Sequence, residues 1–69
     1  MTRDELKTEL EKEIDTIGLM RTMELLVEIC YEKSDHVLST WQDRELAKSW
    51  NTCAQQIDRL STKLDDILP

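Results

Sequence analysis

The chain has 69 residues and a net charge of −6, because 15 acidic side chains outnumber nine Lys and Arg. So short a chain predicts one small domain with a marginal core. The acidic excess argues against nucleic acid or an anionic membrane as a ligand, since binding phosphate requires a basic face. A basic protein partner stays possible, although such a charge also serves simply to keep a small protein in solution.

The chain has no apolar run of the ~18 residues that would span a membrane, and its charged N-terminal segment is unlike a secretory signal. Its two cysteines lie far apart, with no C-x-x-C pair, which favours a reducing compartment over a disulfide scaffold. We therefore expect a cytoplasmic protein.

The first predicted helix covers residues 3–16. Thr2 and Glu5 have the spacing of a capping box, which would begin this helix. An apolar stripe follows on an otherwise charged segment: Leu6, Leu10, Ile14 and Ile17. Gly18, the one glycine, is placed to end the helix in a left-handed conformation. The alternative is a kink at Gly18, with the first helix running into the second.

The second predicted helix covers residues 19–39. Its main apolar stripe consists of Leu19, Met23, Leu26, Cys30 and Val37. Further apolar residues lie off that stripe, among them Leu25, Val27 and Tyr31. A helix that is apolar on more than one side is covered on more than one side, so this helix should be the central element.

The third predicted helix covers residues 43–66. Its apolar stripe repeats at intervals of four and three: Leu46, Trp50, Cys53, Ile57, Leu60, Leu64 and Ile67. Ala47 and Ala54 flank that stripe and are small enough to allow a close neighbour. The stripe is out of phase with that of the second helix, which argues against one continuous rod. Ser39, Thr40 or Asp43 is the expected N-cap.

Folding the chain back near Trp41 brings the two stripes into register. In an antiparallel hairpin, residues at one height have numbers with a constant sum. Five apolar pairs obey this rule: Leu19–Leu64, Met23–Leu60, Leu26–Ile57, Cys30–Cys53 and Val37–Leu46. The pattern predicts an all-α fold with a short N-terminal helix followed by an antiparallel helical hairpin. The first helix could cover one flank in a three-helix bundle, but we favour a homodimer with a four-helix core.

Some residues could carry chemistry. Glu28, Glu32 and His36 recur every four residues on one face of the second helix, where a metal ion or an acid–base pair is conceivable. A single histidine does not match the pattern of di-metal bundles, so a solvated acidic face is favoured. We expect no catalytic residue, no metal ligand and no cofactor.

The two cysteines and the tryptophan at the turn each have two interpretations. Cys30 and Cys53 fall in one layer, where they either form a reversible disulfide or, as we favour, remain reduced thiols in the core. Trp50 is expected in the core. Trp41 either caps the end of the hairpin, the favoured interpretation, or contacts a partner.

The run Ile29-Cys30-x-Glu32-Lys33-x-x-His36, followed by Trp41-Gln42-Asp43 and Trp50, resembles a group of short uncharacterised bacterial proteins. This resemblance covers the middle third of the chain. It implies a stand-alone bacterial protein without an established activity. It also implies that the following residues act as a set: Cys30, Glu32, Lys33, His36, Trp41, Gln42 and Asp43.

That set can be interpreted without catalysis. Asp43 would cap the third helix, His36 and Gln42 would hydrogen-bond across the turn, and Glu32 would orient His36. The expected function is then that of a non-enzymatic protein that self-associates or binds a protein partner. The alternative is a metal- or redox-dependent site built on Cys30, Glu32 and His36.

Overall fold

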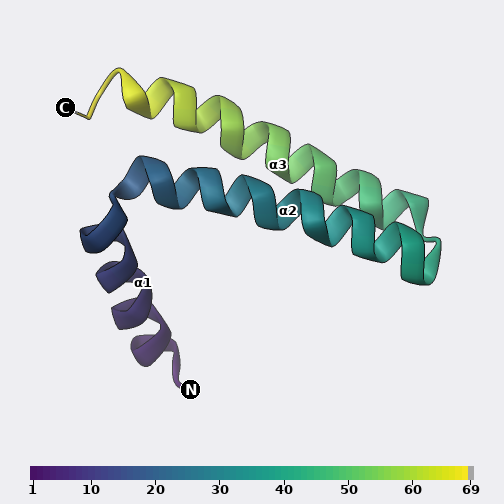
Figure 1. Ribbon diagram of the computed structural model, residues 1–69, viewed down its shortest axis with the longest axis horizontal. Helices are drawn as coiled ribbons and strands as arrows, with labels where there is room; N and C mark the ends of the chain where they lie inside the picture. The colour runs from purple at the N-terminus through teal and green to yellow at the C-terminus, as the bar shows by residue number, and fades with distance from the viewer. Residues whose placement is uncertain (69) are drawn as a thin grey trace.

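In the computed structural model, which describes residues 1–68, the chain forms α1 (Arg3–Ile17), α2 (Leu19–Trp41) and α3 (Arg44–Asp65). α2 and α3 lie side by side and antiparallel, whereas α1 leaves the start of α2 on the side away from α3 (Figure 1). The described residues contain no strand. The all-α fold with an N-terminal helix and an antiparallel hairpin is confirmed, and each helix end lies within two residues of its predicted position.

The two ends of α1 form as their residue types predict. The Thr2 hydroxyl accepts a hydrogen bond from the Glu5 amide at 3.2 Å, which satisfies a free donor of the first turn. Gly18 ends the helix, and its amide donates to the Ile14 carbonyl at 2.7 Å. The φ of 88° and ψ of 156° at Gly18 lie in a region that essentially only glycine adopts. Gly18 therefore sets the sharp change of direction between α1 and α2.

A two-residue link joins α2 to α3. Gln42 adopts a left-handed conformation with φ of 54°, and its amide donates to the Leu38 carbonyl at 3.1 Å. The carboxylate of Asp43 then accepts a hydrogen bond from the Leu46 amide at 3.0 Å. Of the three N-cap candidates, Asp43 is the one that caps α3. The link reverses the chain and starts the return helix within one helical turn.

Small side chains form the contact between α2 and α3. Ala54 has no exposed surface, and Ala47 and Ser34 are buried. The Ser34 hydroxyl donates to the main-chain carbonyl of Ala47 at 2.9 Å. Because the distance between packed helices depends on the side chains at the contact, these small residues draw the two backbones together. Cys30 and Val37 complete the buried side of α2.

No further helix packs over the hairpin of α2 and α3. The Cα atoms of the molecule extend over 40 × 33 × 15 Å. The radius of gyration is 14.1 Å. A compact domain of this length would have a radius of gyration of about 11 Å. Among residues 1–68 no large side chain is fully buried. The hairpin therefore lacks the second layer that normally completes a helical core.

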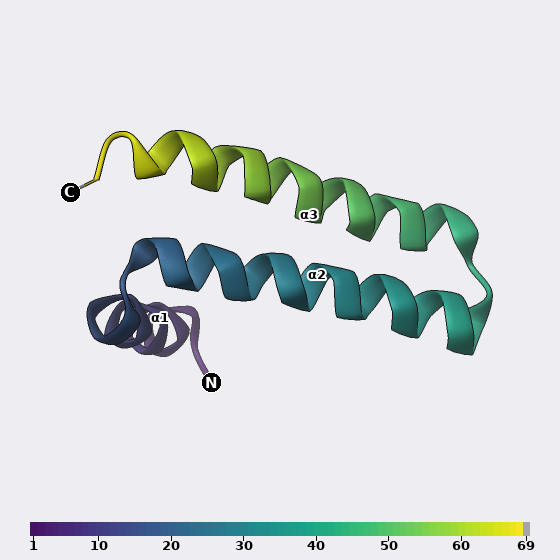
Figure 2. The same ribbon diagram turned by 45° about the horizontal axis from the view of Figure 1, so that its top comes forward.

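α1 does not cover a flank of the hairpin, which corrects the arrangement expected for a three-helix bundle. Figure 2 shows α1 almost end-on, projecting from the open end of the hairpin. None of its residues is buried, and its stripe residues Leu6 and Leu10 remain exposed. The backbone conformation of Gly18 explains this result, because it directs α1 away from α2 instead of folding it back along the hairpin.

Candidate functional site

α3 meets α2 through a different side from the one that its apolar stripe predicts. Cys53 and Leu46 were expected to face α2, as was Leu60, but all three are exposed. Ala54 faces α2 instead. Consecutive helical residues are about 100° apart, so α3 is rotated by roughly a quarter of a turn from the predicted orientation. The physical reason is the closer approach that Ala47 and Ala54 allow, together with the hydrogen bond from Ser34 to Ala47.

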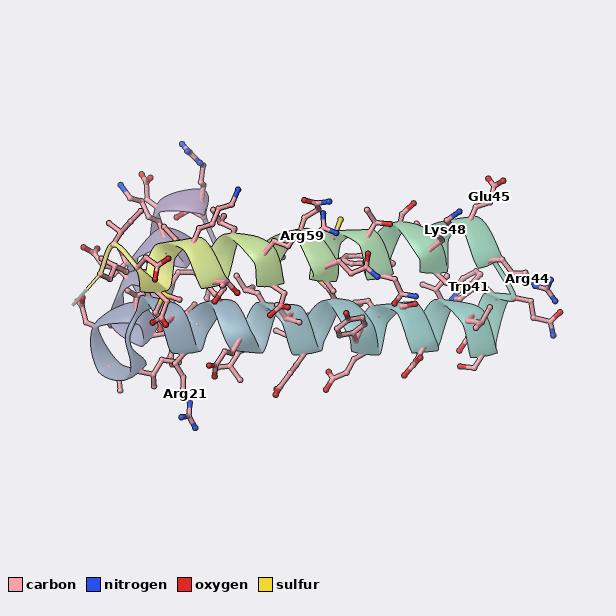
Figure 3. The ribbon with its side chains drawn as sticks, turned by 90° about the horizontal axis from the view of Figure 1, so that it is seen from above. Arg21, Trp41, Arg44, Glu45, Lys48 and Arg59 are labelled. Carbon is pink, nitrogen blue, oxygen red and sulfur yellow. The ribbon has the colours of Figure 1, made fainter. Side chains whose placement is uncertain are left out.

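This rotation leaves a continuous apolar stripe on one side of α3. Leu46 and Leu60 are 47% and 48% exposed, Cys53 between them is exposed, and the residues in the gaps are half-buried. The stripe consists of Leu46, Trp50, Cys53, Ile57, Leu60 and Leu64. Figure 3 shows Glu45 and Lys48 projecting from another side of α3, away from α2. The stripe is therefore a distinct surface on α3, without charged side chains of its own.

Two exposed residues of α2 extend this surface. When α2 is viewed along its axis from its N-terminus, Leu26 and Ile29 lie to one side of the buried Cys30. When α3 is viewed in the same way, the stripe lies to the same side of Ala54. Because the two helices are antiparallel and face each other, these two sides form one face of the hairpin. We call the six stripe residues of α3, together with Leu26 and Ile29, the apolar face.

Polar residues border the apolar face toward the closed end of the hairpin. Ile29 lines a shallow hollow on α2 together with Glu32, Lys33 and His36. The Lys33 and His36 positions continue the side of α2 that carries Leu26 and Ile29. Part of the set predicted from the sequence is thus placed at the edge of the apolar face.

The predicted network across the turn is present only in part. Asp43 caps α3, as expected. Within residues 1–68, however, no side-chain hydrogen bond links His36 to Glu32 or to Gln42. That part of the prediction is wrong, because His36 lies on the side of α2 while the turn is closed by backbone hydrogen bonds and the Asp43 carboxylate. The turn therefore needs neither His36 nor Glu32.

Trp41 does not cap the hairpin. Its side chain is 72% exposed and lies at the closed end near Arg44 (Figure 3). The favoured interpretation was therefore wrong. The first residue of α3 that is buried is Ala47, one turn into the helix, so α3 offers the indole no apolar side chain at the height of Trp41. Trp50, expected in the core, is half-buried at the edge of the apolar face.

The two cysteines lie on different sides of their helices. Both are free thiols; Cys30 is buried as expected, whereas Cys53 is exposed and the prediction of a core thiol there is wrong. The hypothesis of a disulfide across the hairpin loses its basis, because Cys53 belongs to the apolar face and Cys30 to the contact between the helices. Among residues 1–68, no group of three or more His, Cys, Asp and Glu side chains is arranged to hold a metal ion.

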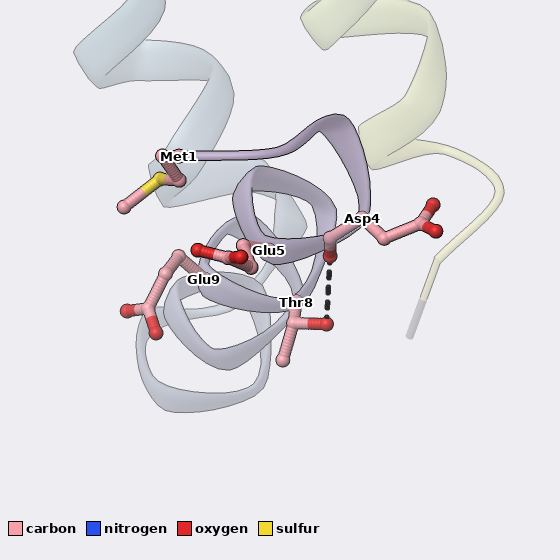
Figure 4. Close-up of a pocket in the computed structure, with 5 residues that line it drawn as sticks. All are labelled: Met1, Asp4, Glu5, Thr8 and Glu9. Carbon is pink, nitrogen blue, oxygen red and sulfur yellow. Dashed lines mark hydrogen bonds between the residues drawn. The ribbon is translucent and has the colours of Figure 1, made fainter.

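Two further hollows each follow a single helix. One lies at the start of α1, where the Thr8 hydroxyl donates to the Asp4 carbonyl at 2.9 Å (Figure 4). It is lined by Met1, Asp4, Glu5, Thr8 and Glu9. The other lies along α3 and is lined by Glu45, Lys48, Ser49, Thr52 and Cys53. All these residues are exposed, and neither hollow brings side chains of two helices together.

Fold and surface define a class: an α-helical hairpin with a projecting N-terminal helix and an uncovered apolar face. Comparison with protein-family models, curated proteins and solved structures finds no match to this chain. The resemblance of the middle third to short bacterial proteins therefore stays a prediction. None of the helices between residues 1 and 68 combines the length and apolarity that crossing a membrane requires.

Proposed function

We propose that this chain is a non-enzymatic association module, which acts by packing its apolar face against a second helical surface. That surface belongs to another copy of the chain or to a protein partner. The observation that carries this proposal is the missing second layer of the hairpin. A layer of amphipathic helices is stable when its apolar side is buried against another element.

The exposed area supports association. The chain exposes 5929 Å² and has a mass of 8.1 kDa. A compact monomer of that mass would expose about 4,500 Å². The excess is roughly 1,400 Å², and a standard protein interface covers about 800 Å² on each partner. Part of this excess belongs to the projecting α1, and the whole is nearly twice what a stable interface requires.

The residues that suggested chemistry support association better than catalysis. Lys33 and His36 border the apolar face beside Ile29, where polar residues typically surround the apolar centre of an interface. Neither side chain makes a hydrogen bond, within residues 1–68, that would hold it in a reactive geometry. The free thiols also accord with the reducing cytoplasm in which we place the protein.

Sedimentation equilibrium tests this proposal with two matched variants. Leu60→Glu puts a charge on the apolar face and should weaken association by more than tenfold, since about 1.4 kcal/mol changes a dissociation constant tenfold. Thr52→Glu puts the same charge on an exposed position of α3 outside that face and should associate like the wild type. Circular dichroism should show that both variants keep their helices, because neither position is buried.

Two results would contradict the proposal. One is a wild-type chain that stays monomeric at millimolar concentration and retains no partner. The other is an equal loss of association in Leu60→Glu and Thr52→Glu, which would place the interface elsewhere.

A further inference from the structure

We infer that a second copy of this chain covers the apolar face, about a two-fold axis that makes α3 antiparallel to the α3 of the other copy. This inference rests on the proposed function and names its partner. It is argued from the spacing of the stripe, the register of the hairpin, the uncovered area and the charge of α1.

The stripe on α3 is self-complementary in the antiparallel direction. Its residues are spaced by four, three, four, three and four, so the spacing is the same when it is followed backward. Centred on Gln55, the stripe places Leu46 opposite Leu64, Trp50 opposite Leu60 and Cys53 opposite Ile57 of the second copy. A two-fold interface must be complementary to itself in this way.

The register of the hairpin places the exposed residues of α2 on the same axis. Ser34 contacts Ala47 across the hairpin. Gln55 lies eight residues after Ala47 on α3, and Leu26 lies eight residues before Ser34 on α2. Both helices rise 1.5 Å per residue, so Gln55 and Leu26 lie at about the same height along the hairpin. Leu26 of one copy then lies opposite Leu26 of the other, and the two Ile29 residues lie about 4.5 Å along the helix on either side of that level. One axis thus pairs the apolar residues of both helices.

The area agrees with a homodimer. A standard interface covers about 800 Å² on each copy, just over half of the roughly 1,400 Å² by which the chain exceeds a compact monomer, so the projecting α1 can stay uncovered. The result is two stacked layers of two helices each, which is a four-helix core.

The charge of α1 favours the antiparallel arrangement. α1 carries six acidic and three basic side chains, a net charge of −3. It projects from the open end of the hairpin (Figure 1). An antiparallel pair places its two α1 helices at opposite ends, whereas a parallel pair would bring the two negative helices together, and like charges repel.

Cysteine cross-linking tests the register. In a background of Cys30→Ala and Cys53→Ser, Leu46→Cys and Leu64→Cys are introduced together and the protein is exposed to a mild oxidant. We expect a covalent dimer in which mass spectrometry finds position 46 of one copy bonded to position 64 of the other. The two positions cannot bond within one chain, because 18 residues of helix separate them by about 27 Å.

The variant with Leu46→Cys alone is the matched control. In the antiparallel register its two thiols lie at opposite ends of the stripe, so it should stay monomeric on a denaturing gel. A disulfide between two copies of position 46 would overturn the antiparallel register. The antiparallel register would also be overturned if sedimentation shows a dimer but no disulfide forms between positions 46 and 64. The proposed association itself would then still stand. A variant and wild type that are both monomeric would overturn this inference, and a monomer that also retains no protein partner would overturn the proposed function.

Discussion

At the scale of single residues, side-chain volume decides which sides of the helices meet. Ala54 is completely buried, and the hydroxyl of Ser34 reaches a main-chain oxygen of the opposite helix. Larger side chains at these positions would hold α2 and α3 apart. Leu46 and Leu60 of α3 therefore remain exposed and are available to a second chain.

The Asp43 cap gives a prediction at this scale. Asp43→Ala removes the acceptor of the Leu46 amide and should lower the free energy of unfolding by about 0.5–2 kcal/mol. Asp43→Ser keeps a capping oxygen and should retain most of the stability. Urea denaturation followed by circular dichroism, at one protein concentration, measures both variants. Equal losses in Ala and Ser would show that the carboxylate acts through something other than the cap.

Single-residue features differed in how well they could be predicted from the sequence. The caps at Thr2 and Asp43 were predictable because their hydrogen bonds are local and depend on a spacing of three residues. The exposure of Trp41 was not predictable, since it depends on where α3 first approaches α2 closely. Likewise, whether His36 and Gln42 meet depends on the orientation of a side chain, and residue spacing alone does not determine it.

At the scale of helices, Gly18 separates two segments that could otherwise be continuous. α1 ends one residue before it and α2 begins one residue after it. A Cβ at Gly18 would meet no atom within 4 Å, so the demand for glycine comes from its backbone conformation and not from crowding. The bend between α1 and α2 therefore depends on one residue type at one position.

Gly18→Ala should join α1 and α2. Alanine is disfavoured by about 1–3 kcal/mol at the φ and ψ of Gly18, and it is the strongest helix former. Adopting helical angles removes the strain and makes one helix of about 58 Å from residue 3 to residue 41. Small-angle X-ray scattering should show a larger maximum dimension, while Thr16→Ala within α1 should leave it unchanged. An unchanged dimension in Gly18→Ala, with lower stability, would show that the bend is held by other contacts.

The sequence pattern determines the helices and their register better than their rotation. Apolar spacing and caps give the three helices, and the slip in phase near Trp41 gives the turn. The rotation of α3 about its axis cannot be predicted, because α3 has two sides that could pack against another helix. One side carries Ala47 and Ala54, and the other carries the leucines. A single sequence does not say which side faces α2 of the same chain and which faces another molecule.

At the scale of the whole molecule, an apolar interface has to form between two chains of like charge. Each chain carries a net charge of −6 and is only 15 Å thick in its smallest dimension. The negative charges of two stacked copies therefore lie close enough to repel each other, and dissolved salt weakens this repulsion by screening the charges. Apolar burial favours association and net charge opposes it.

Raising the ionic strength should therefore strengthen the dimer. Between 0.01 M and 0.15 M salt the Debye length falls from about 30 Å to about 8 Å, and we expect the dissociation constant to fall several-fold. Sedimentation equilibrium across a salt series measures this change. The double variant Glu11→Lys and Glu13→Lys changes each chain from −6 to −2, since each substitution adds two charges, and should show a weaker salt effect. Weaker association at high salt would point to an interface built on ion pairs.

The two tryptophans occupy contrasting surroundings, and the protein thereby contains its own optical reporter. Trp41 lies exposed at the closed end, while Trp50 belongs to the apolar face. When copies stack, the indole of Trp50 loses water and its fluorescence should shift toward shorter wavelengths, whereas Trp41 should stay accessible to a quencher such as iodide. Assembly could thus be followed by emission during dilution, without attaching a dye.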